Sequence, residues 1–369
     1  MNTSKNFWKD KRVLITGHTG FKGSWLTAWM LLKGAKVYGY SLEPEFDKCI
    51  FNEIINDSFI ERYKPLAFKS KIDDINNFNS LKTYIEEINP SIVFHLAAQP
   101  LVIESYRDPI NTWNTNVIGS IKLLESLKSI KSKCAIVMVT TDKVYQNNEW
   151  FYGYRENDSL GGNDPYSASK AAMEIAISSW RNSYCYHFNN NNNLLIATVR
   201  AGNVIGGGDW SKDRIVPDTI RSLLNNETIY IRNPNAKRPW QHVLDPLSGY
   251  ISLAENLYLS SQGSEYESPF NFGPSSKSNK TVKELVEEIL KICPGNWRSK
   301  QNTNNPHEAT LLHLVSDKAE NLLKWKPVWS FEKSIEKTVQ FYLKVKEGES
   351  MINCCLNDIK SFEDDACES

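Results

Sequence analysis

The chain has 369 residues, of which 41% are hydrophobic and 23% are charged, the composition of an ordinary soluble globular protein. Lysine plus arginine and aspartate plus glutamate each number 43, so no net basic charge is present to attract nucleic acid or an anionic membrane. This length predicts two lobes, and the charge balance favours a small-molecule partner.

Targeting and metal-binding signals are not found in the sequence. Residues 1–11 are polar and lead directly into an apolar run, and no segment resembles a signal peptide or a membrane span. The seven cysteines are odd in number and lack pair spacing, which is typical of a reducing compartment. The six histidines are also scattered. We therefore predict a cytoplasmic protein without a metal site.

The first predicted element is a short apolar strand, Arg12–Thr16, followed by a glycine-rich turn and an apolar helix over residues 24–32. Glycines allow the backbone to approach a pyrophosphate, whose charge is stabilised at the N-terminus of a helix. The turn therefore predicts a dinucleotide-binding site. Its candidate residues are Gly17, Thr19, Gly20, Phe21, Lys22 and Gly23.

The second strand is predicted over residues 35–40, and the acidic Glu43 follows it. Glu43 lies near the position of the acid that binds the adenosine ribose in such folds, although a solvated loop acid is an equal interpretation. No arginine follows this strand, which favours NAD over NADP. Lys22 inside the glycine turn keeps NADP as the alternative.

Strand and helix patterns then alternate along the chain. Strands are predicted over residues 68–72, 92–96, 135–140 and 194–200, and helices over residues 78–88, 112–127 and 168–186. This alternation predicts an α/β fold with a parallel, doubly wound (Rossmann) sheet.

The predicted domain boundaries follow from a change of character after the last of these strands. Residues 1–200 are assigned to the NAD-binding domain, and residues 201–346 to a smaller, mixed substrate-binding lobe that is interleaved with it. A final helix is predicted over residues 330–346. Residues 347–369 are predicted to be a disordered tail.

Two polar segments carry the predicted catalytic groups. Thr141, Asp142 and Lys143 follow the strand over residues 135–140, at the carboxyl end where ligands bind in parallel sheets. Tyr166 and Lys170 are four residues apart at the start of a helix, so their side chains share one face. A lysine cation favours the phenolate, so we expect a lowered pKa for Tyr166 and its use as a base for a sugar hydroxyl.

These segments together resemble the extended short-chain dehydrogenase/reductase family from about residue 11 to residue 346, and within it the CDP-glucose 4,6-dehydratases. The decisive segments are residues 17–26, 141–145, 160–166, 200–210 and 238–243. Lys143 stands where dehydratases that act on dTDP-glucose carry glutamate. Asp142 stands where epimerases of the family usually carry a small hydroxylated residue or alanine.

The resemblance implies a homodimer built through helices, a tightly held NAD and a nucleotide sugar bound between the lobes. It implies further cofactor contacts from Ile72, Asp73, Leu96, Ala97, Ala98 and Asn116, together with Tyr166 and Lys170. Residues 70–74 depart from the usual Gly-Asp-Ile-Arg-Asp motif at the adenine. The candidate substrate contacts are Gln99, Asn203, Arg214, Arg238 and His242.

The candidate substrate contacts are not all expected to have the same role. Arg238 is the first choice for clamping the diphosphate, because a guanidinium binds phosphate oxygens in a bidentate manner. His242 is interpreted as a packed loop histidine rather than a catalyst, and no residue that reads the nucleotide base is legible in the sequence.

The implied reaction converts CDP-D-glucose to CDP-4-keto-6-deoxy-D-glucose and water, in the synthesis of deoxysugars for lipopolysaccharide O-antigen. Tyr166, Lys170 and Thr141 would serve the oxidation at C4, with Lys143 as the base at C5 and Asp142 as the acid at C6. If these two form an ion pair, Lys143 is an orienting cation and water the base. The alternatives are a nucleotide-sugar 4-epimerase or a dehydratase of another NDP-glucose.

Overall fold

The computed structural model of the chain describes residues 7–56, 67–185, 193–299 and 311–368. Its centre is a seven-stranded sheet with the strand order β11-β6-β5-β4-β1-β2-β3. All neighbouring pairs in this sheet are parallel. β2 and β3 are added on one side of β1, and β4, β5 and β6 on the other, so the strand order reverses between β1 and β4. The predicted doubly wound Rossmann sheet is confirmed.

The inner strands of this sheet are apolar because both of their faces are covered, whereas the edge strand β3 (Phe68–Ile72) is mostly exposed. β5 and β6, for example, read CAIVMV and LLIATVR and are buried at every position. The seven strands are β1 (Arg12–Thr16), β2 (Lys36–Ser41), β3 (Phe68–Ile72), β4 (Ile92–His95), β5 (Cys134–Val139), β6 (Leu194–Arg200) and β11 (Pro269–Asn271).

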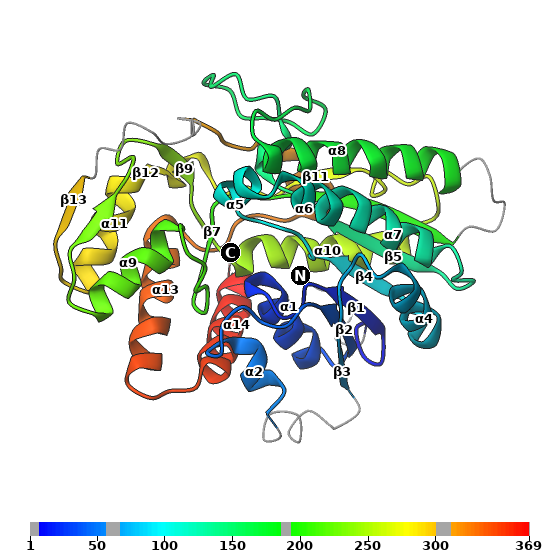
Figure 1. Ribbon diagram of the computed structural model, residues 1–369, viewed down its shortest axis with the longest axis horizontal. Coiled ribbons are helices and arrows are strands. Elements are labelled where there is room, and N and C mark those ends of the chain that lie inside the picture. The colour runs from blue at the N-terminus through cyan, green and yellow to red at the C-terminus, as the bar shows by residue number, and fades with distance from the viewer. Residues whose placement is uncertain (1–6, 57–66, 186–192, 300–310, 369) are drawn as a thin grey trace.

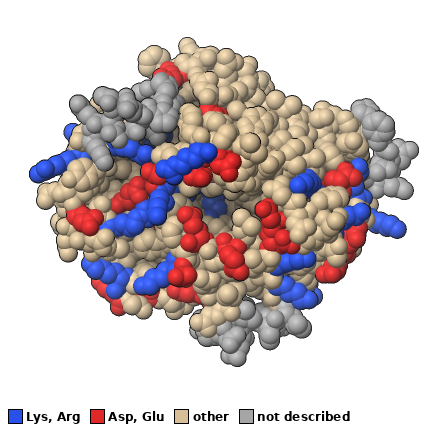
Figure 2. Space-filling model, viewed as in Figure 1, with Lys and Arg blue, Asp and Glu red and all other residues tan. Residues whose placement is uncertain are grey.

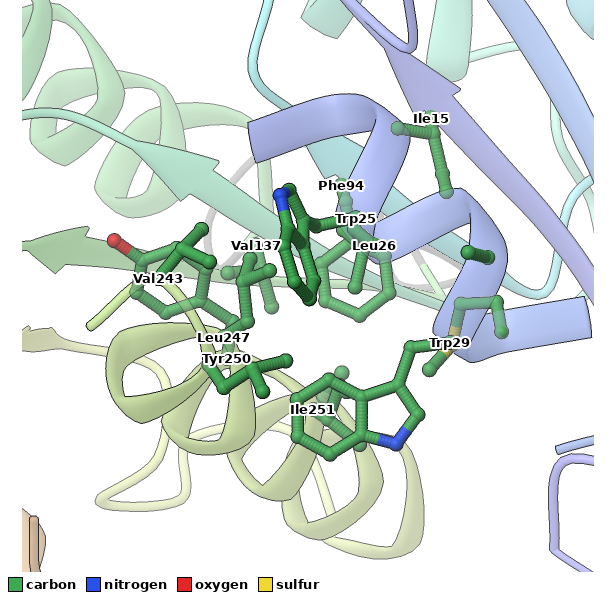
Figure 3. Packing of buried hydrophobic residues seen from close by; sticks show 14 of the residues in the cluster. Ile15, Trp25, Leu26, Trp29, Phe94, Val137, Val243, Leu247, Tyr250 and Ile251 are labelled. Carbon is green, nitrogen blue, oxygen red and sulfur yellow. The ribbon is translucent and has the colours of Figure 1, made fainter. Parts of the chain in front are cut away.

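Helices cover both faces of the sheet (Figure 1). One face is packed by α1 (Phe21–Leu32) and α10 (Leu244–Leu259), and the other by α4 (Phe78–Ile88), α7 (Gly119–Leu127) and α8 (Pro165–Trp180). Figure 3 shows Trp25 of α1 beside Val137 of the sheet, with Leu247 and Tyr250 of α10 on the far side of Val137 in this view. This packing fixes the glycine turn before α1 against the strands.

Two predicted helices are divided in the structure. The helix predicted over residues 112–127 consists of α6 (Pro109–Trp113), a π-helical segment (Asn114–Ile118) and α7. The helix that carries Tyr166 and Lys170 ends at Trp180 and continues as a π-helical segment to Cys185.

The C-terminal lobe has an apolar core of its own, formed by α9, β8, α11, β13 and α13. β7 pairs with β10, which contacts both α10 and α13 and so joins this lobe to the sheet layer, and β9 pairs with β12 within the lobe. These elements are β7 (Val204–Ile205), α9 (Ile215–Leu224), β8 (Ile229–Ile231), β9 (Lys237–Pro239), β10 (Gln241–His242), β12 (Asn279–Thr281), α11 (Val282–Ile292), β13 (Trp297–Ser299) and α13 (Phe331–Lys346).

The chain passes repeatedly between the two layers. After β6 it enters the C-terminal lobe, and it then returns to the sheet as α10 and β11. After β12, α11 and β13 it returns again as α12 (Asp317–Leu323), which packs on α10 and β11. Segments distant in sequence therefore meet on both sides of the interface between sheet and lobe.

The disordered tail predicted for residues 347–369 is not what the structure shows. Helix α14 (Met351–Glu368) packs against α1, α13 and α2 (Ile50–Ile54). Ile352, Cys355, Ile359 and Phe362 recur at helical spacing and are buried, whereas the residues between them are mostly polar. The sequence of this segment is polar overall, so the apolar stripe along one face of α14, which is buried against α1, was not recognised.

None of the helices within the described residues is long and apolar enough to cross a membrane. In the same part of the chain, no group of three or more histidine, cysteine, aspartate or glutamate side chains is arranged to hold a metal ion.

Candidate active site

A cavity of about 1390 Å³ lies at the carboxyl ends of β1, β2, β4, β5 and β6 and extends to the C-terminal lobe. It exceeds the roughly 300–1,000 Å³ of a typical small-molecule pocket, so it has room for more than one ligand. The face drawn in Figure 2 is hollowed at its centre, with basic atoms inside the hollow and acidic side chains beside it.

The glycine turn forms one wall of this cavity. Gly17 has a φ of +73°, and a Cβ atom there would lie 2.7 Å from the backbone nitrogen of Ala97. A Cβ atom on Gly23 would collide with the carbonyl of Gly17, whereas one on Gly20 would meet nothing closer than 3.5 Å. No side chain caps the N-terminus of α1 at Gly20. Its first amides therefore remain for an anion such as a pyrophosphate.

The turn is tied to the end of β2. The hydroxyl of Thr19 donates to the carbonyl of Leu42 at 2.9 Å and shares a hydrogen bond with the hydroxyl of Ser41 at 2.8 Å. Glu43 lines the cavity beside them. Every candidate in the turn also lines it: Gly17, Thr19, Gly20, Phe21, Lys22 and Gly23.

The expected adenine contacts lie two residues further along the chain. Asp74 and Ile75 line the cavity, and Ile72 and Asp73 do not. The carboxylate of Asp73 instead accepts hydrogen bonds from the side chain of Ser80, which lies in the first turn of α4. This contact with α4 holds the Asp73 carboxylate outside the cavity lining.

The end of β4 contributes a third wall through Leu96, Ala97, Ala98 and Gln99. Asn116 does not line the cavity. Its side chain accepts from the Gln99 backbone nitrogen at 2.9 Å and donates to the hydroxyl of Ser169 at 2.9 Å. Asn116 therefore holds this wall against α8 rather than facing a ligand.

Tyr166 and Lys170 project from the first turns of α8 into the cavity. Asp164 caps this helix by accepting from the backbone nitrogen of Ser167 at 2.9 Å. The ammonium of Lys170 donates to the carbonyl of Val139 at 3.1 Å. Burial lowers the pKa of Lys170 to about 7, the charge of Lys22 adds to this effect, and Glu174 opposes it.

The expected lowering of the Tyr166 pKa does not hold in the structure. Burial raises the pKa of Tyr166, and the positive charge of Lys143 and a hydrogen bond to Thr141 oppose that rise. Lys170 carries less charge near neutral pH than the sequence argument assumed, because its own pKa is lowered by burial. The phenolate of Tyr166 is favoured instead by Thr141 and Lys143, which lie in the turn after β5.

That turn is a short 3₁₀ helix, Asp142–Val144, capped by the side chain of Thr141. One carboxylate oxygen of Asp142 accepts from the hydroxyl of Thr141 at 3.0 Å and from the ammonium of Lys143 at 3.3 Å. Asp142 is completely buried and Lys143 is partly exposed. Thr141 and Lys143 line the cavity, whereas the buried Asp142 does not. Asp142 and Lys143 form an ion pair.

Most of the predicted substrate contacts also line the cavity, namely Gln99, Asn203, Arg214 and Arg238. Asn203 has a φ of +50° at the bend between β6 and β7. The guanidinium of Arg214 bonds to the carboxylate of Asp209 at 2.9 Å, which fixes its position at the cavity wall.

His242 is the exception. Its ring is fully buried between Trp25 and Trp329, and it does not line the cavity. Burial lowers its pKa to about 3. His242 is a packed residue of β10 and not a substrate contact, because the strand directs it toward the core.

Sequence reasoning missed the end of the cavity that lies on the C-terminal lobe. Its polar lining comes from α9 and from β8 and the loop after it, and includes Asp218, Arg221, Ser222, Asn225, Tyr230, Arg232 and Asn233. These residues form no local motif. They share a wall only because α9 and β8 pack on one apolar core.

The sequence of the chain is similar to those of known proteins. The sequence pattern of the GDP-mannose 4,6 dehydratases matches residues 14–338. The chain belongs to this family. It is 44% identical over 362 residues to a CDP-glucose 4,6-dehydratase of Salmonella typhimurium, covering 97% of this chain and 98% of that protein. It is 26% identical to GDP-mannose 4,6 dehydratase 1 of Arabidopsis thaliana, over 95% of both chains.

Several solved structures have the same fold as this chain. A dTDP-glucose 4,6-dehydratase of Bacillus anthracis in complex with NAD superposes with a TM-score of 0.73 at 23% identity, over 93% of this chain and 99% of that one. A UDP-glucose 4-epimerase of Thermotoga maritima with UDP-glucose gives 0.74 at 22% identity, over 91% and 99%. At these identities the likeness supports the fold alone.

Proposed function

We propose that the protein is an NAD-dependent dehydratase that converts CDP-D-glucose to CDP-4-keto-6-deoxy-D-glucose and water. The observation that carries this proposal is the meeting of two functional pairs at one cavity. Tyr166 and Lys170 come from α8, and Asp142 and Lys143 come from the turn after β5. The 44% identity to a CDP-glucose 4,6-dehydratase over nearly the whole chain supports the same substrate.

The glycine turn and the end of β2 are proposed to bind the cofactor. The glycines leave space for a pyrophosphate against the first turn of α1. The carboxylate of Glu43, which lines the same cavity, would repel the 2′-phosphate of NADP if it reaches the ribose. NAD held by these residues would supply reversible hydride transfer between C4 and C6 of the sugar.

Tyr166 is proposed as the base that takes the proton of the C4 hydroxyl. Thr141 hydrogen-bonds to Tyr166 and can orient the same sugar oxygen. Lys170 is anchored by the Val139 carbonyl, one helical turn after Tyr166 on α8, and is proposed to assist the proton transfer. The resulting C4 ketone makes the C5 proton acidic.

Asp142 and Lys143 are proposed to carry out the elimination. The side-chain nitrogen of Lys143 lies 3.3 Å from a carboxylate oxygen of Asp142. A proton that moves along the 3.3 Å contact from Lys143 to Asp142 leaves a neutral amine to take the C5 proton and a carboxylic acid to protonate the leaving C6 hydroxyl. If the pair instead stays ionised, Lys143 orients a water molecule that acts as the base.

The nucleotide is proposed to extend toward the C-terminal lobe. Arg214 and Arg238 line the cavity on that side, and guanidinium groups suit the two phosphates of a nucleoside diphosphate. Gln99 and Asn203 are proposed to contact the sugar and the adjacent phosphate.

A homodimer is proposed through α6 and α8. These helices pack against each other and leave large apolar side chains in solvent, with Ile110 74% and Ile175 59% exposed. Trp113 and Ile118 add to the same surface. Analytical ultracentrifugation measures this state directly.

A cytoplasmic location and a role in deoxysugar synthesis for lipopolysaccharide O-antigen are also proposed. The location is supported by the seven cysteines, none of which forms a disulfide in the described part of the chain. The pathway follows only from the sequence resemblance.

Incubation of the purified protein with CDP-glucose in deuterated water, without added reductant, tests the activity. We expect loss of one water, a methyl group at C6 and deuterium at C5, measured by mass spectrometry and NMR. Recovery of a sugar of unchanged composition with inverted C4 would establish the 4-epimerase instead. Absence of turnover on CDP-glucose together with turnover on another NDP-glucose would reassign the substrate.

Asp142→Asn distinguishes the two reaction classes in the same assay. An epimerase does not need this carboxyl group, whereas a dehydratase loses its acid at C6 and should slow by about 100-fold or more. The melting temperature of the variant serves as the control for folding.

A further inference from the structure

The groups assigned to oxidation and to elimination lie on different elements of the fold. Tyr166 and Lys170 belong to α8, and Asp142 and Lys143 belong to the turn after β5. In the proposed reaction they act on neighbouring carbons of one sugar, so their separation must be held within a fraction of an ångström. A buried ion pair between Glu174 and Arg200 is bonded to both elements.

Glu174 connects α8 to the start of the turn. It lies on α8 one helical turn after Lys170. One carboxylate oxygen accepts from the hydroxyl of Thr140 at 2.6 Å and from Nε of Arg200 at 2.9 Å. The other accepts from the hydroxyl of Thr198 at 2.7 Å and from Nη2 of Arg200 at 3.0 Å. Thr140 directly precedes the Thr141-Asp142-Lys143 segment.

Arg200 connects the same pair to the other end of the turn. Its Nη1 donates to the hydroxyl of Tyr145 at 2.8 Å and to the carbonyl of Glu156 at 2.9 Å. Tyr145 follows the turn directly, and its hydroxyl donates to Asn271 of β11 at 2.7 Å. The turn is therefore held at both of its flanks by one ion pair.

The pair is built to be rigid. The side chains of Glu174 and Arg200 are each only 2% exposed. Burial opposes the ionisation of Glu174, but the charge of Arg200 and the hydrogen bonds from Arg200, Thr140 and Thr198 lower its pKa. A buried ion pair adds little net stability compared with apolar residues, because desolvation offsets the attraction. A fully satisfied network does fix geometry.

We propose that Glu174 and Arg200 are positioning residues, which hold the Asp142-Lys143 turn at a fixed distance from Tyr166 so that oxidation and elimination act on the same bound sugar. Neither side chain lines the cavity, so both act through Thr140 and Tyr145. This inference rests on the proposed dehydratase activity.

A matched pair of variants tests the inference. Thr140→Val and Thr198→Val each keep the shape of the side chain and remove one hydrogen bond to the same carboxylate, but only Thr140 is joined to the turn. We expect Thr140→Val to lower kcat by about 10-fold or more and to change KM by less than about 3-fold. Thr198→Val should keep both within about 2-fold of the unchanged protein.

A second readout separates positioning from simple stability. The reaction is quenched with borodeuteride, and mass spectrometry measures the ratio of oxidised but undehydrated CDP-sugar to dehydrated product. Thr140→Val and Tyr145→Phe should both raise this ratio, because elimination is misaligned while oxidation continues. Thr198→Val should leave it unchanged, whatever its melting temperature.

Equal losses of kcat in Thr140→Val and Thr198→Val, or an unchanged ratio in Thr140→Val and Tyr145→Phe, would overturn the positioning role. Failure of the unchanged protein to dehydrate CDP-glucose would instead count against the proposed function, so the two failures are distinguishable.

Discussion

Gly202 shows how strictly single residues are constrained around the reacting groups. It follows β6, and a Cβ atom at this position would overlap the carboxylate of Asp142. Gly202→Ala is therefore expected to push Asp142 away from Lys143 and to lower kcat by about 100-fold, because catalytic groups tolerate little displacement.

The check is a comparison of kcat, deuterium incorporation at C5 and melting temperature between Gly202→Ala and the unchanged protein. Gly202 is not in the left-handed backbone region, so alanine adds no backbone strain and only the contact with Asp142 changes. Full activity of the variant would show that the carboxylate does not need this position.

The site residues that were predicted correctly are those marked by a short local motif in the sequence. The glycine turn, Tyr166 with Lys170, and Thr141 with Lys143 all reach the cavity, because each lies directly beside the end of a strand or the start of a helix. Asp73 and His242 do not, because their directions depend on contacts with α4 and with Trp329. The Glu174–Arg200 pair was also missed, since its members are 26 residues apart and meet only in the folded sheet.

Among the elements, α14 offers the clearest test. Ile359 on this helix is completely buried, whereas its neighbour Lys360 is exposed. Ile359→Ala is expected to cost about 2–5 kcal/mol of unfolding free energy, because it leaves a cavity in the core. Lys360→Ala should change it by less than about 0.5 kcal/mol. Denaturant unfolding of both variants measures the difference, and two neutral variants would mean that the tail does not pack.

Six strands of the central sheet were predictable to within a residue or two. The inner ones, such as β4 and β5, were predictable because a parallel strand buried on both faces is a continuous apolar run. β11 was not, since a strand of three residues has no recognisable period. α14 was missed for a different reason. Its apolar stripe includes two adjacent cysteines and is diluted by acidic residues, and its partner α1 lies more than 300 residues earlier in the chain.

For the whole molecule, buried histidines predict sensitivity to acid. Burial lowers the pKa of His18 to about 4 and those of His95 and His242 to about 3, from 6.5. Below pH 6.5 the unfolded chain binds protons at these rings and the folded chain does not. Stability present above pH 6.5 is therefore lost as the pH falls, by up to about 1.4 kcal/mol per pH unit for each ring.

Asp245 opposes part of this loss, because burial raises its pKa to about 7 and the folded state favours its protonated form. Burial also raises the pKa values of Glu156, Asp218 and Asp358, which act in the same direction as Asp245. The three histidine shifts together extend from pH 6.5 to about pH 4 or below, so the melting temperature should still fall between pH 7 and pH 4.5 in calorimetric scans. His242→Gln should make this fall less steep. A melting temperature that stays constant over the range would contradict the assignment of neutral buried rings.

The repeated passage of the chain between the sheet and the C-terminal lobe limits how the cavity can open. A protein whose lobes are joined by one linker can swing them apart by turning a few backbone angles. Here β7, β10, α10 and α14 all cross or brace the same boundary, so rotation at one connection is resisted by the others. The nucleotide sugar must then enter and leave through the opening of a cavity whose overall shape is kept. Its exchange depends on movement of side chains and surface loops rather than on separation of the two lobes.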